Sequence, residues 1–264
     1  MIKQKLIKLH WLLDSQFGLD PLRLIQSIRG LPGFFADWLR FRRSYSGSLN
    51  WMPCLHDRFA EGGTTKSEYF WQDLLVARMV YEAKPEKHVD IGSRVDGFVA
   101  HVASFRSLEV FDVRPISASI PGVVFKQADM MSGDNLPDHV GVGYCDSLSC
   151  LHALEHFGLG RYGDPIDPMG YVRGLSNMAS LLRADGTLYL SVPIGRERVE
   201  FNANRVFDPE ALIRLAESHA LRLQKLIVVS ARGDVEAAAT LSKENIANLA
   251  EVDYNLGLFV FAKT

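Results

Sequence analysis

Cysteine is scarce in this chain, and long apolar runs are absent. Its 264 residues include only three cysteines, Cys54, Cys145 and Cys150, with no C-x-x-C pair among them. An odd, scattered set favours plain thiols in a reducing compartment over a disulfide framework. No apolar run reaches the roughly 18 residues of a transmembrane helix, and the N-terminus lacks the apolar block and cleavage site of a signal peptide. We therefore expect a cytoplasmic protein.

An excess of charge of one sign is lacking too. The net charge of −2 argues against a general nucleic-acid binder. Residues 1–43 differ from the rest, because eight Lys and Arg stand there against three Asp, a net charge of +5. This arm is also rich in aromatic residues, such as Trp11 and Trp38. It is typical either of a helical segment that docks on its own domain or on a partner subunit, or of one that lies peripherally on the inner face of a membrane.

The order of predicted elements divides the chain into two domains. Residues 1–66 read as a basic helical arm and a loop, with helix breaks at Pro21 and around residues 30–33. Residues 67–264 alternate short apolar strands with helices, which predicts a mainly parallel sheet covered by helices on both faces. One helix is expected over 167–186, with Asp167 as its N-cap. Strands are expected at 87–92, 108–113, 122–129, 144–151, 187–193, 223–230 and 257–262.

Acidic residues stand at the ends of three successive predicted strands. Asp90 and Gly92 close the first strand, Asp112 closes the second and Asp129 the third. In open α/β sheets the ligand binds beyond the carboxyl ends of the strands, and a carboxylate about 20 residues after the glycine turn meets ribose hydroxyls. The glycine lets the backbone approach a ligand closely, beside the free N–H groups of a helix N-terminus. We therefore expect a nucleoside-binding crevice at this edge.

The stretch HALEHFGLGRYGDPIDP, residues 152–168, contains two patterns that carry chemistry elsewhere. H-x-x-E-H occurs in some zinc peptidases, but it needs a continuous helix and a third ligand, and here the chain turns at Gly158 after barely one helical turn. G-x-G-x-x-G is a dinucleotide fingerprint, but it belongs directly between the first strand of a unit and its helix. Both interpretations are disfavoured, and no metal site is expected.

What remains is a polar, glycine-rich loop at the end of the fourth strand. It suits recognition of a hydroxylated substrate and deprotonation of one hydroxyl. Histidine fits the role of base through its pKa near ~6.5, so the base is His156 or His152, with Glu155 orienting one of them. Alternatively, His152 and Glu155 only stabilise the turn. The residues expected to hold the acceptor are Arg161, Tyr162 and Asp164 in the loop, and Asn202, Asn204 and Arg205 after the fifth strand.

Several segments resemble a known family. HVDIG, VFDV, QAD, LHALEHF and LRADGTLYLSVP resemble the ordered motifs of Rossmann-like, class I S-adenosylmethionine-dependent methyltransferases, over residues 67–263. More narrowly, HVDIGSRVDGFVAH, SLSCLHALEHFGLGRYGDPIDP and SVPIGRERVEFNANRVF resemble a methyltransferase-like family that is labelled a domain of unknown function and is found with bacterial surface-polysaccharide biosynthesis.

The resemblance implies a seven-stranded sheet with an antiparallel last strand, and S-adenosylmethionine as the cofactor. It implies that Asp112 takes the ribose hydroxyls, and that Asp129 and Met130 face the adenine. By the same resemblance the methionine part of the cofactor is held by the loop after the first strand, with Asp90, Gly92, Ser93 and, as the last glycine, Gly97.

One position departs from the methyltransferase pattern. Arg94 stands where the loop should have its next glycine, and Gly97 comes one residue late. An arginine there either crowds the cofactor or points to solvent. Two functions follow. The first is an O-methyltransferase acting on a sugar or glycan intermediate of surface-polysaccharide biosynthesis. The second, which Arg94 favours, is a non-catalytic methyltransferase-like scaffold or binding protein in glycan assembly.

Overall fold

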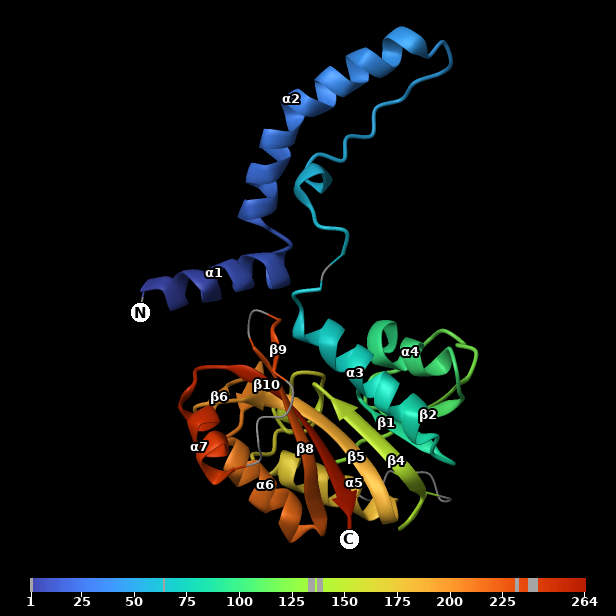
Figure 1. Ribbon diagram of the computed structural model, residues 1–264, viewed down its shortest axis with the longest axis vertical. Coiled ribbons are helices and arrows are strands. Elements are labelled where there is room, and N and C mark those ends of the chain that lie inside the picture. The colour runs from blue at the N-terminus through green and yellow to red at the C-terminus, as the bar shows by residue number, and fades with distance from the viewer. Residues whose placement is uncertain (1, 64, 133–135, 137–139, 231–232, 237–241) are drawn as a thin grey trace. The chain divides into compact units, whose positions relative to one another are not determined.

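Two compact units make up the chain, Met1–Thr64 and Thr65–Thr264. The first unit is helical, and the second is built on one large sheet (Figure 1). None of the helices in the described part of the chain combines the length and the apolar character that crossing a membrane requires. The computed structural model describes residues 2–63, 65–132, 136, 140–230, 233–236 and 242–264.

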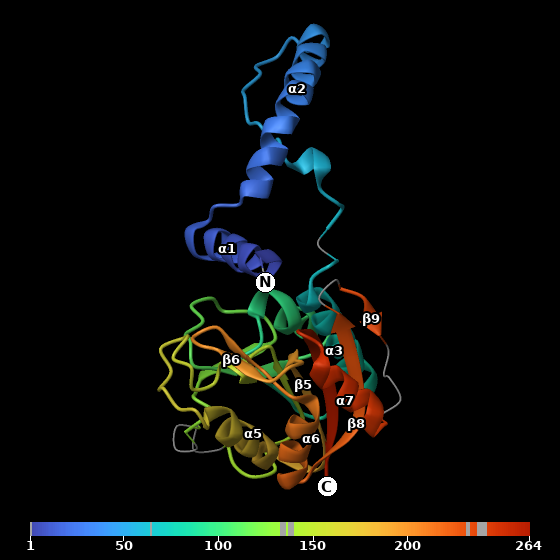
Figure 2. The same cartoon turned by 90° about the vertical axis from the view of Figure 1, so that its left-hand side faces the viewer.

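The first unit consists of two helices and a segment that returns along the second. Helix α1 spans Ile2–Phe17, and α2 spans Pro21–Ser44. Asp20 caps α2, because its carboxylate accepts hydrogen bonds from two N–H groups of the first turn. Both views show the segment after α2 turning back alongside it (Figures 1 and 2), and this segment contains the 3-10 turn η1, Asp57–Phe59.

The helix break predicted around residues 30–33 is wrong, because α2 runs through it. A Cβ on Gly30 would lie 2.2 Å from the carbonyl oxygen of Leu55, so this glycine serves a close approach of the returning segment. Pro32 deprives α2 of one hydrogen bond, but the ring of Trp51 packs against aromatic side chains of α2 and supports the helix. The break predicted at Pro21 is confirmed.

The second unit has a Rossmann-like α/β architecture around an eight-stranded sheet. The five parallel strands are β1 (His88–Ile91), β2 (Leu108–Asp112), β3 (Val123–Gln127), β4 (Cys145–Leu151) and β5 (Leu182–Ile194). Strand β10 (Asn255–Lys263) lies between β5 and β8 (Leu221–Ser230) and is antiparallel to both, and β9 (Val235–Glu236) pairs with β8 at the edge. The order β3-β2-β1-β4-β5-β10-β8-β9 confirms the mainly parallel sheet with an antiparallel last strand and adds β9.

Helices cover both faces of this sheet (Figures 1 and 2). One apolar cluster joins the sheet to α3 (Glu68–Ala83), the π-type turn η2 (Val95–Val99) and α4 (Ala100–Ala103). The other joins it to α5 (Gly170–Leu181), α6 (Pro209–Ser218) and α7 (Lys243–Glu251). Because the central strands are buried on both sides, they read in sequence as short, nearly continuous apolar runs. A separate hairpin, β6 (Arg198–Glu200) and β7 (Asn204–Val206), follows β5.

The strand order reverses between β1 and β4, and this reversal creates a crevice at their carboxyl ends. Gly92, directly after β1, has φ +69, and a Cβ there would lie 3.0 Å from the Cβ of Ala153 in the loop after β4. A glycine therefore allows the two loops to meet.

The glycine-rich loop after β4 is closed by hydrogen bonds within itself. The backbone N–H groups of Gly158, Gly160 and Tyr162 all donate to the carboxylate of Asp164. The N–H of Asp167 donates to the carbonyl oxygen of Gly158 at 2.9 Å. The amides of the apparent dinucleotide fingerprint are thus already bound to a carboxylate of their own chain.

The helix predicted over 167–186 is shorter, and Asp167 is not its N-cap. Helix α5 begins at Gly170, because residues 167–169 form the turn that closes the glycine-rich loop. The carboxylate of Asp167 accepts a hydrogen bond from the N–H of Met169 and pairs with Arg173. The predicted closing pair, residues 185–186, lies within the span of β5.

Replacing Gly158 by alanine should destabilise the protein more than the same change at Gly163. Both glycines have positive φ, +76 and +81, so alanine at either costs about 1–2 kcal/mol. At Gly158 the new Cβ would also lie 1.9 Å from the carbonyl oxygen of Asp167, whereas nothing lies within 4 Å at Gly163. In urea denaturation we expect the free energy of unfolding to fall by about 1 kcal/mol for Gly163→Ala and by about 3 kcal/mol or more for Gly158→Ala. Equal losses of unfolding free energy in the two variants would mean that the loop rearranges around the new Cβ without destabilising the domain.

Candidate active site

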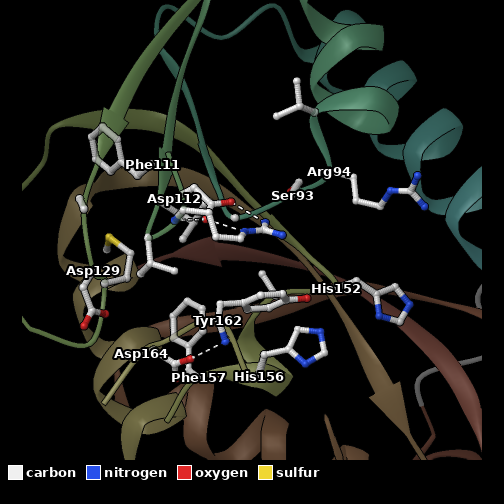
Figure 3. Close-up of a pocket in the computed structure, with 18 of the residues that line it drawn as sticks. Ser93, Arg94, Phe111, Asp112, Asp129, His152, His156, Phe157, Tyr162 and Asp164 are labelled. Atoms are coloured by element: carbon white, nitrogen blue, oxygen red, sulfur yellow. Dashed lines mark hydrogen bonds and ion pairs between the residues drawn. The ribbon is translucent and has the colours of Figure 1, made fainter. Parts of the chain in front are cut away.

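A cavity of about 510 Å³ lies at the carboxyl ends of β1 to β4. Its walls come from the loops after β1, β2 and β3, from the glycine-rich loop, and from Tyr69 at the start of α3. This volume is usual for a small-molecule site. Figure 3 shows Asp112 and Asp129 on one side of it, with Tyr162 and His156 nearby.

Two of the three predicted carboxylates line the cavity, and the third lies behind its wall. Asp112 and Asp129 are on the wall, and Met130 lines it beside Asp129. Asp90 is fully buried, and its carboxylate accepts hydrogen bonds from the hydroxyls of Ser93 at 2.6 Å and Ser149 at 2.5 Å. Burial raises the pKa of Asp90 to about 7. Asp90 therefore fixes the turn after β1 and does not itself face a ligand.

Gly92 and Ser93 lie on the wall as predicted, but Gly97 does not. The hydroxyl of Ser93 accepts a hydrogen bond from the N–H of Leu151 and so ties the turn to β4. A Cβ on Gly97 would lie 2.2 Å from a carboxylate oxygen of Asp73 in α3. Gly97 is thus required by the packing of η2 against α3, and its predicted cofactor contact is not supported.

Arg94, the departure from the methyltransferase pattern, leaves the cavity open. Its guanidinium pairs with Asp96, with 2.7 Å between Nη2 and Oδ2, and lies 5.2 Å from the centre of the Tyr69 ring. In Figure 3 its side chain extends away from Asp112. Since about half of the side chain is exposed, 53%, the solvent-facing alternative describes Arg94.

A different arginine occupies the predicted ribose site. Arg114 donates from Nε to Oδ1 of Asp112 at 2.9 Å and from Nη2 to Oδ2 at 2.6 Å. Its guanidinium also lies 4.4 Å from the centre of the Tyr162 ring. Arg114 therefore links the end of β2 to the glycine-rich loop, and a ligand that hydrogen-bonds Asp112 has to compete with it.

His152 is held between two carboxylates. It follows β4 with φ +51, which is uncommon for a residue other than glycine. Its Nδ1 lies 2.6 Å from Glu155 and its Nε2 lies 3.3 Å from Glu68 of α3, while its ring stacks on Tyr69. Burial by itself would lower the pKa of His152, but the two carboxylates raise it to about 10. At neutral pH this side chain is an imidazolium that has no capacity to accept a proton.

His156 has the opposite character. It ends the 3-10 turn η4 (Leu154–His156), and its Nδ1 lies 2.6 Å from the carbonyl oxygen of Ala203 in the β6–β7 turn. A carbonyl only accepts, so Nδ1 carries the proton and Nε2 keeps a lone pair. Burial lowers the pKa of His156. The side chain is therefore a neutral imidazole on the cavity wall at pH 7.

Glu155 lies fully buried between the two histidines. Its Oε1 is 2.6 Å from Nδ1 of His152 and 3.7 Å from Nε2 of His156. Burial opposes its ionisation, but the positive charge of the neighbouring imidazolium keeps the pKa of Glu155 below its usual range. Glu155 does not line the cavity, so it orients His152 without touching a ligand.

Arg161 and Tyr162 lie on the wall beside His156, as predicted for acceptor contacts. Nη1 of Arg161 donates to the carbonyl oxygen of Ala203 at 2.9 Å and lies 3.4 and 3.5 Å from the two ring nitrogens of His156. These nearly equal distances place the guanidinium against the imidazole face. Its positive charge also lowers the pKa of His156, after the larger effect of burial.

Of the other predicted acceptor contacts, Asp164, Asn204 and Arg205 have hydrogen-bond partners within the chain, and Asn202 is exposed. Asp164 lines the cavity, but both of its carboxylate oxygens accept hydrogen bonds from loop amides. Asn202 sits at the exposed turn of the β6–β7 hairpin, and Asn204 donates to the carbonyl of its neighbour. Arg205 is buried and donates to backbone carbonyls of the glycine-rich loop, at 2.6 Å in the shortest case. The hairpin thus contributes to the site through the backbone carbonyl of Ala203.

Glu68, Tyr69 and Arg114 are the site residues that the sequence did not reveal. Glu68 and Tyr69 come from α3, which precedes the first strand, and no local pattern places that helix beside the cavity. The sequence did contain an indication for Arg114, because a basic side chain two residues after Asp112 can fold back and pair with the Asp112 carboxylate. Across the described residues, no group of three His, Cys, Asp or Glu side chains is placed to hold a metal ion.

Replacing His152 by asparagine should cost stability in a pH-dependent way. Asparagine tolerates the left-handed backbone, but it removes the charge between Glu68 and Glu155. The pKa of His152 is about 6.5 in the unfolded chain and about 10 in the folded one. Its contribution is therefore complete below pH ~6.5 and disappears as the pH rises through about 10. In urea denaturation, the free energy of unfolding should be about 3 kcal/mol higher for the wild type than for His152→Asn near pH 6. This difference should shrink towards pH 10. A difference that grows with pH would contradict the charge assignment.

One family model matches the sequence, over residues 142–258. It describes a Caenorhabditis protein of unknown function, DUF268. The match is less than half of the chain, and it includes the glycine-rich loop and its two histidines but not Asp112 or Asp129. No curated protein matches the sequence.

Solved structures are similar over most of the chain. The Burkholderia thailandensis 1,6-didemethyltoxoflavin-N1-methyltransferase, solved with 1,6-didemethyltoxoflavin and S-adenosylhomocysteine bound, has a TM-score of 0.52 at 15% identity, over 74% of this chain and 79% of that one. The [4+2]-cyclase SpnF has a TM-score of 0.50 at 15% identity, over 72% of this chain and 81% of that one.

This likeness identifies the fold. The sheet order and the antiparallel late strands are those of the class I S-adenosylmethionine-dependent methyltransferase fold, which confirms the Rossmann-like prediction. The fold alone does not determine the reaction, since one of these similar proteins is named a methyltransferase and the other a cyclase. The second unit therefore has a methyltransferase-like fold around a cavity that contains a neutral histidine.

Proposed function

We propose that the protein is an S-adenosylmethionine-dependent O-methyltransferase that acts on a hydroxyl of a sugar or glycan intermediate of surface-polysaccharide biosynthesis. One observation carries the proposal. A neutral histidine with a lone pair on Nε2, His156, shares a cavity with the strand-end carboxylates of Asp112 and Asp129. The sugar acceptor and the pathway rest on the resemblance of the glycine-rich loop to its family.

The residues on the cavity wall fit the cofactor. Asp112 would accept hydrogen bonds from the ribose hydroxyls, and Asp129 with Met130 would face the adenine. Gly92 and Ser93 would receive the methionine part, and a side chain at Gly92 would crowd Ala153. When bound, the cofactor would supply an electrophilic methyl group that needs no further activation. The task of this chain is then to orient the acceptor and remove its proton.

His156 is the residue suited to that proton. Its Nδ1–H is fixed on the carbonyl oxygen of Ala203, which leaves Nε2 to accept a proton from an acceptor hydroxyl. The imidazolium formed would be stabilised by Glu155, whose Oε1 lies 3.7 Å from Nε2. His152 is charged at neutral pH and is not suited to that role; its Nδ1 lies 2.6 Å from Glu155, so the two side chains hold each other in place.

Arg161 and Tyr162 are the side chains placed to hold the acceptor beside His156. Tyr162 is partly exposed and offers an aromatic face, and Arg161 offers hydrogen-bond donors. Together with Asp129, which also lines the cavity, they form a polar and aromatic wall, which suits a hydroxylated ring.

The second candidate function is a non-catalytic methyltransferase-like binding protein in glycan assembly. Arg114 favours it, because its guanidinium takes both carboxylate oxygens of Asp112 that the ribose would need. Affinity for the cofactor product separates the two functions. No calorimetric binding of S-adenosylhomocysteine at millimolar concentration would end the methyltransferase proposal.

Substitutions at Asp112 and Arg114 should change that affinity in opposite directions. Asp112→Asn removes the acceptor of the ribose hydrogen bonds and should weaken S-adenosylhomocysteine binding about tenfold or more. Arg114→Met removes the competitor for the carboxylate and should strengthen binding about threefold to tenfold. Arg94→Met is the matched control, since Arg94 is on the wall but pairs with Asp96, and it should change little. Weaker binding in Arg114→Met would mean that Arg114 holds the ligand itself.

Replacing His156 by alanine should lower methyl transfer about 10²–10⁴-fold and leave S-adenosylhomocysteine affinity unchanged. The base must be unprotonated, and the pKa of His156 lies below the usual value near ~6.5. The value of kcat/KM should therefore rise with pH up to this lowered pKa and stay level at higher pH. Release of S-adenosylhomocysteine with a panel of sugar nucleotides measures the rate. Full turnover in His156→Ala would remove His156 as the base.

A further inference from the structure

We propose that α2 docks the protein on an anionic lipid surface through an exposed apolar stripe flanked by arginines. The proposal concerns the first unit alone. It does not depend on the methyltransferase function proposed for the second unit.

The stripe consists of Leu24, Ile28, Leu31, Phe35 and Leu39. These residues recur at intervals of three or four, so they share one face of the helix. Their side chains are between 37% and 62% exposed. An exposed row of large apolar side chains on one helix is typical of a surface that binds a membrane or another protein.

Other parts of α2 are already covered by the returning segment, whose Trp51 also packs against Phe35 of the stripe, with 5.5 Å between the ring centres. Gly30 meets the backbone of Leu55, and the ring of Trp38 packs edge-on against Trp51 at 5.4 Å. Asp37 pairs with Arg58 of the same returning segment. The returning segment therefore covers a neighbouring part of α2 and touches the stripe at Phe35, while each stripe residue remains at least 37% exposed.

Charge identifies the partner of the stripe. Helix α2 contains five arginines, at positions 23, 29, 40, 42 and 43, against a single acid, Asp37. Arg42 and Arg43 lie in its last turn. A lipid surface with acidic headgroups attracts such a helix while the acyl region receives the apolar stripe, and the long arginine side chains reach back to the headgroups. A second copy of α2 would bring two clusters of like charge together, which disfavours self-association.

Vesicle flotation of the full-length protein tests this surface. The probes are vesicles of phosphatidylcholine alone and vesicles of phosphatidylcholine and phosphatidylglycerol in equal parts. The wild type should float with the anionic vesicles, and not with the neutral ones. Added salt should release it, because salt screens the headgroup charge.

Two double variants separate the apolar and the charged contributions. Leu24→Asp with Ile28→Asp should abolish flotation, and Arg42→Gln with Arg43→Gln should weaken it about tenfold or more. The matched controls lie on exposed helices of the second unit. Leu74→Asp, and Arg78→Gln with Arg214→Gln, should float like the wild type. Circular dichroism checks that each variant keeps its helix content.

Each other outcome would overturn the proposal. Equal flotation with neutral vesicles would show that acidic headgroups do not direct binding. No flotation, with a dimer in light scattering that Leu24→Asp/Ile28→Asp dissociates, would assign the stripe to a second copy of the chain. No flotation of a monomer would mean that the protein covers the stripe itself. Calorimetry with S-adenosylhomocysteine is unaffected by all of these results, so failure here remains distinct from failure of the proposed reaction.

Discussion

The buried carboxylate of Glu155 determines the protonation states of His152 and His156. A carboxylate out of water is costly unless a cation is next to it, and His152 supplies that cation at 2.6 Å. Once His152 is charged, a second imidazolium 3.7 Å from the same carboxylate is disfavoured by burial, by His152 and by Arg161. Two histidines four residues apart therefore differ in protonation at the same pH. The left-handed backbone of His152 and the 3-10 turn that follows it are the local strain that brings both rings to one carboxylate.

A ligand that binds Asp112 would compete with Arg114, and this competition would also affect the glycine-rich loop. Arg114 contacts Tyr162 as well as Asp112, so displacing it alters the glycine-rich loop along with the cofactor side. A ligand at the end of β2 and an acceptor beside His156 would thus both contact the surroundings of Arg114. Occupancy of the first site would then influence the second without movement of the sheet.

The sequence predicted the sheet and its switch point because those depend on local patterns: short apolar runs, a glycine after the first strand, and acids at strand ends. It placed Asp112, Asp129, Gly92 and His156 on one cavity correctly. It did not reveal which of the predicted residues have partners within the protein. Asp164 lines the cavity but accepts hydrogen bonds from its own loop amides, Arg205 donates to carbonyls of that loop, and Gly97 lies against Asp73. Glu68 lies more than eighty residues before His152, and no spacing rule links the two.

The two halves of the cavity differ in how they relate to other proteins. The half at the ends of β1 to β3 has the strand-end geometry of a fold shared by proteins with different reactions. The family match begins after that half and covers the glycine-rich loop, the β6–β7 hairpin and the strands that support them. In this half the Ala203 carbonyl fixes the tautomer of His156, and Asp164 holds the glycine-rich loop. Binding a nucleoside does not by itself require a neutral histidine on the wall of the same cavity. That arrangement is the strongest reason to expect proton removal here.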